Sequence, residues 1–358
     1  MHLVILPGDG IGPEICDSTL AVLGLLNEKF GLGLTWESHD IGLATLLTYG
    51  TTFPQAAKNA AMAADGIILG PISHNDYPPK AEGGINVSGD LRLSLDLYAN
   101  IRPARSRDGL QFWGRTPMDL VIVRENTEGF YADRSMHMGP GEFMPTPDMA
   151  LAIRKITAQA CERIARVAFE LAMARGRHIT AVHKANVLRA SDGLFLREVR
   201  AVAAEFPEVA YDEQLIDSMT AMLVRDAARF DVVVTTNMYG DILSDEAAEL
   251  SGSLGLAGSI NAGDNHCMAQ AQHGSAPDIA GQDKANPASL ILSAGMLLGW
   301  LGRKHGLANY VRAAAVIEPA VDALIADPAA RTADLGGTLG TRAFTEALCA
   351  EAGRLWSA

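Results

Sequence analysis

The chain has 358 residues, 48% of them hydrophobic, and this length predicts about two domains with large buried cores. Its formal net charge of -13 argues against nucleic acid or an anionic membrane as a partner, because too few lysines and arginines are available to neutralise phosphates. The four cysteines are scattered and no signal peptide is visible at the N-terminus, so the sequence predicts a reduced, cytoplasmic protein.

Short apolar runs alternate with helical patterns along the chain. Strands are predicted at residues 2–6, 33–38, 66–70, 119–124, 179–183, 208–212 and 231–235. Helices are predicted at 12–30, 54–64, 147–175, 191–205, 217–229, 241–251, 286–305, 308–325 and 341–355. This alternation is typical of an α/β protein. Residues 132–147 are rich in Gly, Pro and Met, which is compatible with a disordered loop or with a hairpin arm that packs on another subunit.

The glycine-rich segment LPGDGIGPE, residues 6–14, joins the first strand to the first helix. It resembles a dinucleotide-binding fingerprint but lacks the third glycine, because Pro13 stands in that position. Pro13 is suited to the first turn of a helix, where its missing N–H costs nothing. A plain strand-to-helix turn and a loop beside a cofactor both remain open interpretations.

Asp241 and Asp245 lie four residues apart in NMYGDILSDEAAEL, after the apolar run at 231–235. A turn at Tyr239-Gly240 would place both in the first turns of a helix, at the carboxyl end of a strand, where α/β sheets bind ligands. Like charges at this spacing repel, so a helix N-terminus, a basic neighbour or a metal ion must offset them. Carboxylates suit Mg²⁺ or Mn²⁺. Asp241 alone, and Asp217 at the start of another helix, could instead be helix caps.

Three arginines complement these acids. Arg124 ends an apolar strand, which is a poor place for an unpaired cation, and Arg102 precedes a proline in an extended segment. Guanidinium groups bind carboxylates bidentately, so Arg92, Arg102 and Arg124 together could clamp a polycarboxylate. Each of them alone could equally form a structural ion pair.

Two further residues have possible roles in proton transfer. Lys184 follows the strand at 179–183 and could act as a general base if desolvation lowered its pKa, or could simply be exposed. Tyr131, in ENTEGFYADR, could donate a proton or pack as an aromatic residue.

Six segments, taken together and in order, resemble the metal-dependent β-decarboxylating dehydrogenases, which include enzymes for isocitrate, homoisocitrate, 3-isopropylmalate and tartrate or D-malate. They are LPGDGIGPE, LDLYANIRP, VIVRENTEGFY, HKANVL, NMYGDILSDEAAEL and HGSAPDIAGQDKANP. The resemblance implies an isopropylmalate-dehydrogenase-like two-domain α/β fold that is distinct from the Rossmann fold. Residues 1–97 and 251–358 would bind the cofactor, and residues 98–250 would bind substrate and form a dimer. The active site would lie in the interdomain cleft, and 132–147 would be an intersubunit arm.

The resemblance also implies the roles of individual residues. Asp241 and Asp245 would bind the metal, joined by Asp217 from the partner subunit. Lys184, also from the partner, would act with Asp217 on the substrate hydroxyl, and Tyr131 would protonate the enol that forms after decarboxylation. Substrate would be bound by Asn86, Ser88, Arg92, Arg102, Arg124 and Asn186, and the cofactor by His273, Gly274, Ser275, Ala276, Asp278 and Asn286.

The identities of the cofactor and of the substrate are inferred from only a few residues. Asp278 would accept hydrogen bonds from the adenosine ribose and repel a 2′-phosphate, which favours NAD over NADP. Asn86 and Ser88 resemble the residues that bind the third carboxylate of isocitrate, although Asp90 would disfavour a carboxylate unless it points away. Isocitrate or homoisocitrate is therefore favoured, while tartrate, D-malate and 3-isopropylmalate remain alternatives. A homodimer with shared active sites is expected, with further pairing of dimers left open. A catalytically silent regulatory subunit is disfavoured because Lys184 and Tyr131 are present.

Overall fold

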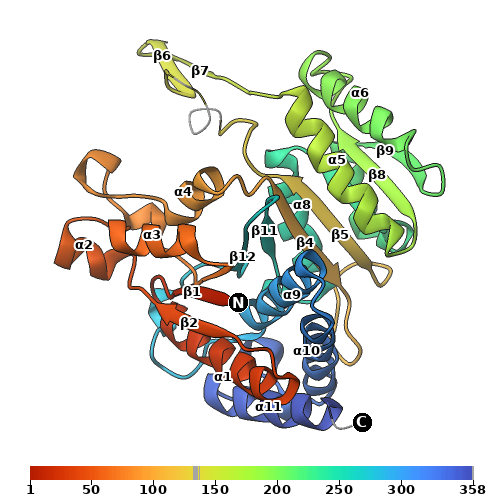
Figure 1. Cartoon of the computed structure of the whole chain (residues 1–358). Helices are drawn as coiled ribbons and strands as arrows, with labels where there is room; N and C mark the ends of the chain where they lie inside the picture. Colours follow the sequence, from red (N-terminus) through yellow and green to blue (C-terminus); the bar gives the residue numbers. More distant parts are fainter. Residues whose placement is uncertain (132–135, 137, 357–358) are drawn as a thin grey trace.

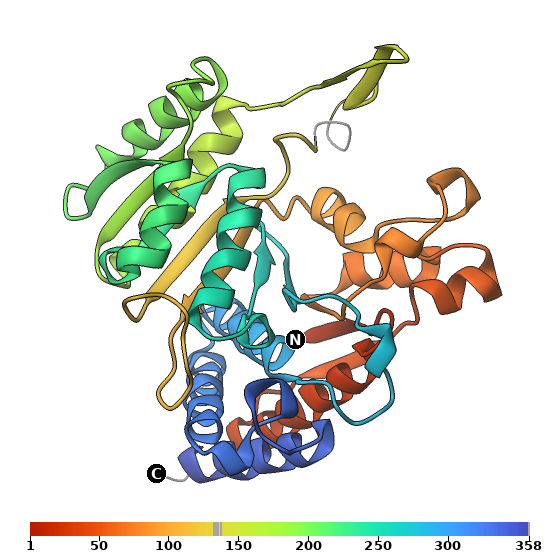
Figure 2. The same ribbon diagram turned by 180° about the vertical axis from the view of Figure 1, so that it is seen from behind.

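The computed structural model describes residues 1–131, 136 and 138–356. The chain folds around a ten-stranded mixed sheet in the order β2-β1-β3-β12-β11-β4-β5-β10-β8-β9, with helices on both faces (Figure 1 and Figure 2). A separate pair, β6 and β7, forms a hairpin. Among the described residues, no helix has both the length and the apolar character needed to cross a bilayer.

The strands are β1 (His2–Leu6), β2 (Thr35–Ser38), β3 (Gly66–Leu69), β4 (Ala99–Arg105), β5 (Asp119–Glu125), β6 (Glu142–Thr146), β7 (Met149–Ala152), β8 (His178–His183), β9 (Ala210–Leu215), β10 (Val232–Thr235), β11 (Ile260–Ala262) and β12 (Cys267–Gln270). The helices are α1 (Gly12–Phe30), α2 (Leu43–Tyr49), α3 (Gln55–Ala63), α4 (Val87–Ser94), α5 (Ala158–Met173), α6 (Ser191–Ala203), α7 (Ile216–Asp226), α8 (Asn237–Ser251), α9 (Ala288–His305), α10 (Ala308–Ala326) and α11 (Thr341–Trp356).

The sheet has two halves that come from different parts of the sequence. Strands β1, β2, β3, β11 and β12 make one half, and β4, β5, β8, β9 and β10 make the other. Pairing is antiparallel at the centre, where β12, β11, β4 and β5 meet, and parallel on either side. The division into domains at 1–97 plus 251–358 and 98–250 stays a prediction.

Both faces of β1 and β10 are buried, which explains why their sequences are mostly apolar rather than alternating. In β1, Leu3 and Ile5 pack in a core under α1, α9 and α11, while Val4 and Leu6 pack in a core on the other face with α3 and α4. The second half repeats this arrangement. The strand β10 sends its side chains alternately toward α5 and α6 and toward α7 and α8.

Several predicted element boundaries were wrong. The helix expected at 147–175 begins only at Ala158, after Thr157 accepts a hydrogen bond from the Ala160 N–H at 3.3 Å. Residues 149–152 instead form β7, which pairs with β6. No turn occurs at Tyr239-Gly240, because α8 already begins at Asn237. The sequence patterns did not predict β4, β11, β12, α2 or α4.

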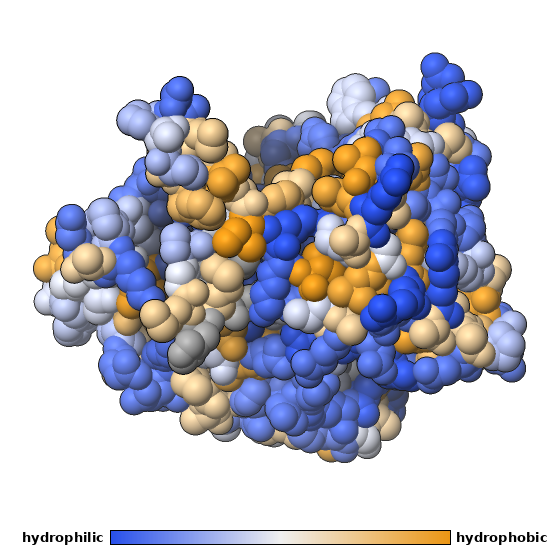
Figure 3. All heavy atoms as spheres, turned by 90° about the horizontal axis from the view of Figure 1, so that it is seen from above, coloured by the Kyte–Doolittle hydropathy of each residue, from blue (hydrophilic) through white to orange (hydrophobic). Residues whose placement is uncertain are grey.

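The hairpin of β6 and β7 projects away from the rest of the molecule (Figure 1 and Figure 2). It covers the second half of the arm predicted at 132–147 and continues to residue 152, whereas residues 132–135 and 137 lie outside the described part. The hairpin exposes large apolar side chains, with Met144 62% and Met149 49% accessible. Figure 3, which looks down on the side from which the hairpin projects, shows apolar patches among hydrophilic residues on this face. Such exposure marks a surface suited to contact with another protein.

Candidate active site

A polar pocket of about 270 Å³ lies beside the carboxyl end of β5. It is lined by the start of α4, by β4, β5 and α8, and by the end of β12 with the loop that follows. Nine residues that the sequence marked as site residues line it: Asn86, Ser88, Arg92, Arg102, Arg124, Tyr131, Asp241, His273 and Gly274. The fold therefore brings together side chains that lie up to 188 positions apart, counted from residue 86 to residue 274.

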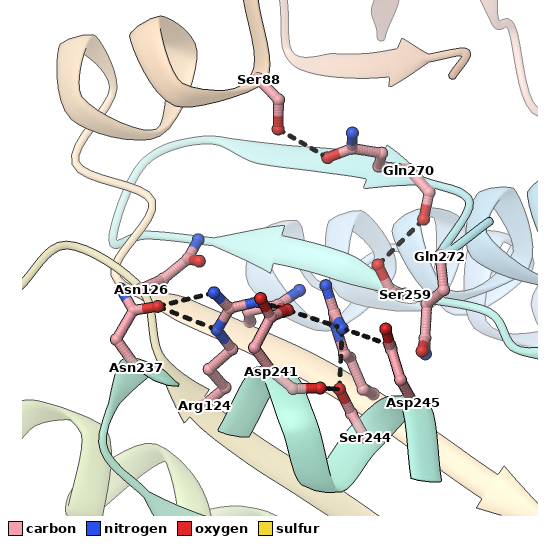
Figure 4. Close-up of polar contacts among 12 residues, drawn as sticks. Ser88, Arg124, Asn126, Asn237, Asp241, Ser244, Asp245, Ser259, Gln270 and Gln272 are labelled. Atoms are coloured by element: carbon pink, nitrogen blue, oxygen red, sulfur yellow. Dashed lines mark hydrogen bonds and ion pairs between the residues drawn. The ribbon is translucent and has the colours of Figure 1, made fainter. Parts of the chain in front are cut away.

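Two buried arginines face the acids of α8 (Figure 4). Arg124 donates to Asp241, and Arg102 Nη1 lies 3.4 Å from Asp241 Oδ1 and 3.2 Å from Asp245 Oδ1. The two like charges on α8 thus have basic neighbours, which is one of the three ways in which their repulsion could be offset.

One face of α8 supplies further contacts that the sequence analysis missed. Asn237 Oδ1 accepts bonds from Arg124 Nε at 3.1 Å and Nη2 at 2.6 Å, and Ser244 Oγ accepts from Arg102 Nη1 at 2.7 Å. Helical spacing from Asp241 could have identified both, since residues three and four apart share a face. The close packing of α8 on Arg124 also explains the glycine at position 240, because a Cβ there would collide with the aliphatic stem of Arg124.

The electrostatics of this region favour an anion. Burial, followed by the nearby Arg124 charge, lowers the pKa of Arg102 to about 10. Burial is also the main reason that the pKa of Asp245 lies above its ordinary value, although Arg102 acts against it. Two adjacent buried guanidinium groups repel each other. A carboxylate bound beside them in the pocket would offset this repulsion.

Several buried polar atoms of the pocket lack hydrogen-bond partners within the described part of the chain. They are Arg102 Nε, Asn126 Oδ1, Gln272 Oε1 and His273 Nε2. Such atoms are rare in folded proteins and usually require water or a ligand. Both donors and acceptors are represented, which suits a ligand that carries carboxylate and hydroxyl groups.

The wall opposite α8 is formed around Gln270, which the sequence analysis also missed. Gln270 Oε1 accepts from Ser88 Oγ at 2.9 Å (Figure 4). It also accepts from Arg92 Nη2 at 3.4 Å. Asn86 caps α4 by accepting the Gly89 N–H at 2.9 Å. Asp90, the departure noted in the sequence, points away from the pocket and pairs with Lys58.

Lys184, Asp217 and Asn186 do not line the pocket of their own chain. Lys184 Nζ lies 2.7 Å from Asp217 Oδ1, and this hydrogen bond is the main reason that the pKa of Asp217 lies below its ordinary value. Asn186 is exposed. The pair therefore presents a cation and an acid on the surface, where a second chain could meet them.

The donor atoms at α8 fit a hard divalent cation. Asp241 and Asp245 contact the arginines only through Oδ1, and no described residue donates a hydrogen bond to either Oδ2. Both side chains are partly exposed, at 40% and 56%. Within the described residues, no three His, Cys, Asp or Glu side chains come close enough together to hold a metal. The remaining ligands would have to be water, substrate or a residue of another chain.

Comparison with known proteins decides the family. The family model for isocitrate/isopropylmalate dehydrogenase matches residues 2–348. The chain belongs to this family. It is 42% identical to the isocitrate/homoisocitrate dehydrogenase of Thermus thermophilus over 348 residues, 97% of each chain. It is 40% identical to the 3-isopropylmalate dehydrogenase of Archaeoglobus fulgidus over 343 residues, 96% of each chain. The crystal structure of isocitrate dehydrogenase from Methylococcus capsulatus superposes with a TM-score of 0.85 at 37% identity, covering 98% of this chain and 99% of that one.

Membership in the isocitrate/isopropylmalate dehydrogenase family confirms the resemblance and the α/β fold class predicted from the sequence. Enzymes of this family are dehydrogenases that depend on NAD or NADP and on a divalent metal. The relatives named above act on different substrates, so their names do not fix the substrate of this chain.

In this member of the family, the predicted cofactor loop packs against the first glycine-rich turn. The Ile11 N–H donates to the Ser275 carbonyl at 2.8 Å, and a Cβ on Gly10, whose φ is +58°, would collide with that carbonyl. Asp278 lies in the exposed segment that follows Ala276. Asn286 is held by Asp334, at 3.0 Å. The segment LPGDGIGPE therefore supports the loop, and the roles of these residues in cofactor binding stay predictions.

A buried ion pair fixes the position of Lys184. Arg154, just after the hairpin, donates to the fully buried Asp192, and the other carboxylate oxygen of Asp192 accepts the Lys184 backbone N–H. We expect Arg154→Leu to lower the free energy of unfolding by about 3 kcal/mol, because it leaves a buried carboxylate uncompensated. Urea denaturation followed by circular dichroism measures this loss.

The matched control is Arg166→Leu, which breaks an exposed pair with Glu205 and should cost less than about 1 kcal/mol. Equal losses in the two variants would contradict a structural role for the Arg154–Asp192 pair.

Proposed function

We propose that this chain is an NAD-dependent, divalent-metal-dependent dehydrogenase that oxidises and decarboxylates a 3-substituted D-malate-type 2-hydroxy acid, with isocitrate or homoisocitrate as its substrate. The observation that carries this proposal is the convergence of Arg92, Arg102 and Arg124 on a pocket bordered by Asp241 and Asp245. Three cations opposite two acids suit a polycarboxylate that is bound together with a divalent cation.

In the proposed reaction, different residues of the chain act in successive steps. Arg102 and Arg124 would exchange their present contacts with α8 for the carboxylates of the substrate and hold it in place. Lys184 and Asp217 would take the hydroxyl proton as the alcohol becomes a ketone. After the β-carboxylate leaves as CO₂, Tyr131 would give a proton to carbon 3.

Two bound groups would complete the site. Asp241 and Asp245 would hold Mg²⁺ or Mn²⁺, which supplies Lewis-acid polarisation of the substrate oxygen, while NAD accepts the hydride. The residues proposed to bind NAD are His273, Gly274, Ser275, Ala276, Asp278 and Asn286. An acid at position 278 favours NAD because it would repel the extra phosphate of NADP.

The proposed assembly is a homodimer with shared active sites. Lys184 and Asp217 do not line the pocket of their own chain, and among the described residues the only acid that lines this pocket is Asp241, with Asp245 one turn further along α8. A second copy could supply both residues at once. The exposed apolar side chains of the hairpin support contact between chains.

The polarity of the pocket favours a polar substituent on the substrate. Ser88, Asn126, Ser259, Gln270 and Gln272 all line it, and within the described residues Asn126 Oδ1 and Gln272 Oε1 have no hydrogen-bond partner. An isopropyl group would leave such groups unpaired, and sites built from hydrogen-bonding side chains reject apolar analogues strongly. This supports isocitrate or homoisocitrate over 3-isopropylmalate.

We expect Gln270→Glu to lower kcat/KM for isocitrate about tenfold relative to kcat/KM for D-malate, because a new negative charge beside Ser88 and Arg92 would repel the third carboxylate. Initial rates with both substrates give this ratio. Gln111→Glu, at an exposed position, is the matched control. An unchanged ratio in the Gln270→Glu variant would remove Gln270 from substrate recognition.

The experiment that tests the proposed function is a substrate screen. The purified protein is incubated with NAD and Mn²⁺ and with isocitrate, homoisocitrate, 3-isopropylmalate, D-malate or tartrate, and NADH formation is followed at 340 nm. The proposal expects the highest kcat/KM with isocitrate or homoisocitrate. Turnover of 3-isopropylmalate alone would overturn the assignment of the substrate, and no NADH from any acid would favour a catalytically silent subunit.

A further inference from the structure

A second and larger cavity, of about 460 Å³, lies beside the same strands as the candidate active site and has a different character. It is bounded by β4, β5, the end of α5, residues 251–260, and the facing sides of α9 and α10, which lie next to β4 in Figure 1. Its volume is in the range of small-molecule sites in proteins. Most of its wall is apolar, including Val121, Leu256, Leu292, Met296 and Ile317.

Strand geometry separates this cavity from the candidate active site. Successive side chains of a strand point to opposite faces of the sheet. On β4, Ile101 and Pro103 line the cavity, whereas Arg102 between them lines the active-site pocket. On β5, Val121 lines the cavity and Arg124, three residues later, lines the pocket. A molecule in the cavity would therefore lie behind the arginines and not among them.

Four arginines line the cavity, and three of them are already neutralised by acids. Arg105 and Arg107 pair with Glu318 and Asp322, and Arg175 pairs with Asp119 and Asp231. Arg303 differs, since within the described part of the chain its guanidinium has neither a hydrogen bond nor an ion pair. It lies along the wall, with Nη1 3.3 Å from the point where a Cβ on Gly299 would stand.

We propose that this cavity binds a small amphipathic carboxylic acid, with its chain among the apolar side chains and its carboxylate on Arg303. An unpaired guanidinium beside apolar walls matches such a ligand at both ends, because the carboxylate gains a charge-assisted bidentate hydrogen bond and the chain is removed from water. Arg303 is exposed and therefore hydrated when no ligand is bound, so a neutral hydrocarbon would gain nothing from its charge, and a small polar anion would gain nothing from the walls. The inference does not depend on the proposed enzymatic activity.

Calorimetric titration of the full chain with butyrate, hexanoate, octanoate and octanol tests the proposal. Affinity should rise about threefold to fourfold for each methylene group added, since each one is buried on binding. Octanoate should bind more tightly than octanol because only the acid can use Arg303. No binding of octanoate, or affinity that is independent of chain length, would overturn the proposal.

Variants assign the binding to this cavity. Arg303→Gln should weaken octanoate binding about tenfold and leave octanol binding unchanged. The matched control is Arg312→Gln, an exposed arginine on α10 that does not line the cavity, and it should have no effect. Met296→Trp fills the cavity and should abolish binding of both ligands. If that variant fails to fold, as judged by circular dichroism, Arg303→Gln still decides the test.

One more variant tests whether octanoate binds in the candidate active-site pocket instead of the cavity. Arg92→Gln removes a cation from the candidate active site and should leave octanoate binding unchanged. If Arg92→Gln weakens binding and Arg303→Gln does not, octanoate occupies the active-site pocket and the proposed second site is wrong.

Discussion

Replacing Asp241 by asparagine is expected to lower kcat about a thousandfold while the protein stays folded. The asparagine oxygen can still accept the hydrogen bond from Arg124, so the contacts of the two buried arginines largely remain. What the variant loses is one of the two negative charges available to a divalent cation on α8. Turnover with Mn²⁺ measures the loss, and thermal unfolding shows whether the fold is retained.

Binding of the metal gives a readout independent of turnover. Titration with Mn²⁺, followed by electron paramagnetic resonance of the free ion, should show much weaker binding to the Asp241→Asn protein than to the wild-type protein. Asp108→Asn removes an exposed carboxylate that does not line the pocket, and this variant should bind Mn²⁺ normally. Normal binding by the Asp241→Asn protein would contradict the metal role of this residue, and so would full activity of the wild-type protein after exhaustive EDTA treatment.

Much of the fold could be predicted because the long strands have strong local signals. The predicted strands at 2–6, 119–124 and 231–235 have apolar centres at 3–6, 120–123 and 232–234, as strands buried on both faces must have, and the structure places strands there. The short strands β11 and β12 have no such signal. Their positions depend on pairing with β4 and β3, which lie far away in the sequence.

The hairpin shows how a local pattern can mislead. Met-Ala-Leu-Ala at 149–152 has residues that favour helices, and the sequence analysis accordingly began a helix there. In the structure these residues are exposed and pair with β6, so the partner strand and not the intrinsic propensity decides their conformation.

The charged residues of the site could be predicted, and most of their neutral neighbours could not. Arg124 stands out because a charge at the end of an apolar strand needs an explanation, and Asp241 stands out because Asp245 repeats its charge four residues later. Gln270 and Gln272 carry no charge and belong to no motif by themselves. Gln270 contacts Ser88, which lies 182 residues away in the sequence, and Gln272 contacts the Gly258 carbonyl. Such contacts come from the tertiary fold alone.

Replacing Lys184 by methionine is expected to lower kcat about a thousandfold with little change in KM, because the variant loses a group that takes part in proton transfer. It also removes the hydrogen bond that holds the pKa of Asp217 below its ordinary value. Asp217 would then become protonated at a higher pH, so the acid limb of the pH profile should move upward. Lys29→Met, at a partly exposed lysine on α1, is the control and should leave kcat and the pH profile unchanged.

The same variant tests whether two chains share each active site. If the site of one chain uses its own Asp241 and the partner's Lys184, a dimer of one Lys184→Met chain and one Asp241→Asn chain has one intact site and one doubly altered site. Mixing the two inactive proteins under conditions of subunit exchange should then restore about a quarter of wild-type activity, since half of the dimers are mixed and each has one working site. Activity that stays near zero after exchange is verified by mass spectrometry would place both residues in the site of a single chain. That result would require a movement bringing the Lys184–Asp217 pair into its own pocket, because these residues do not line it in the present structure.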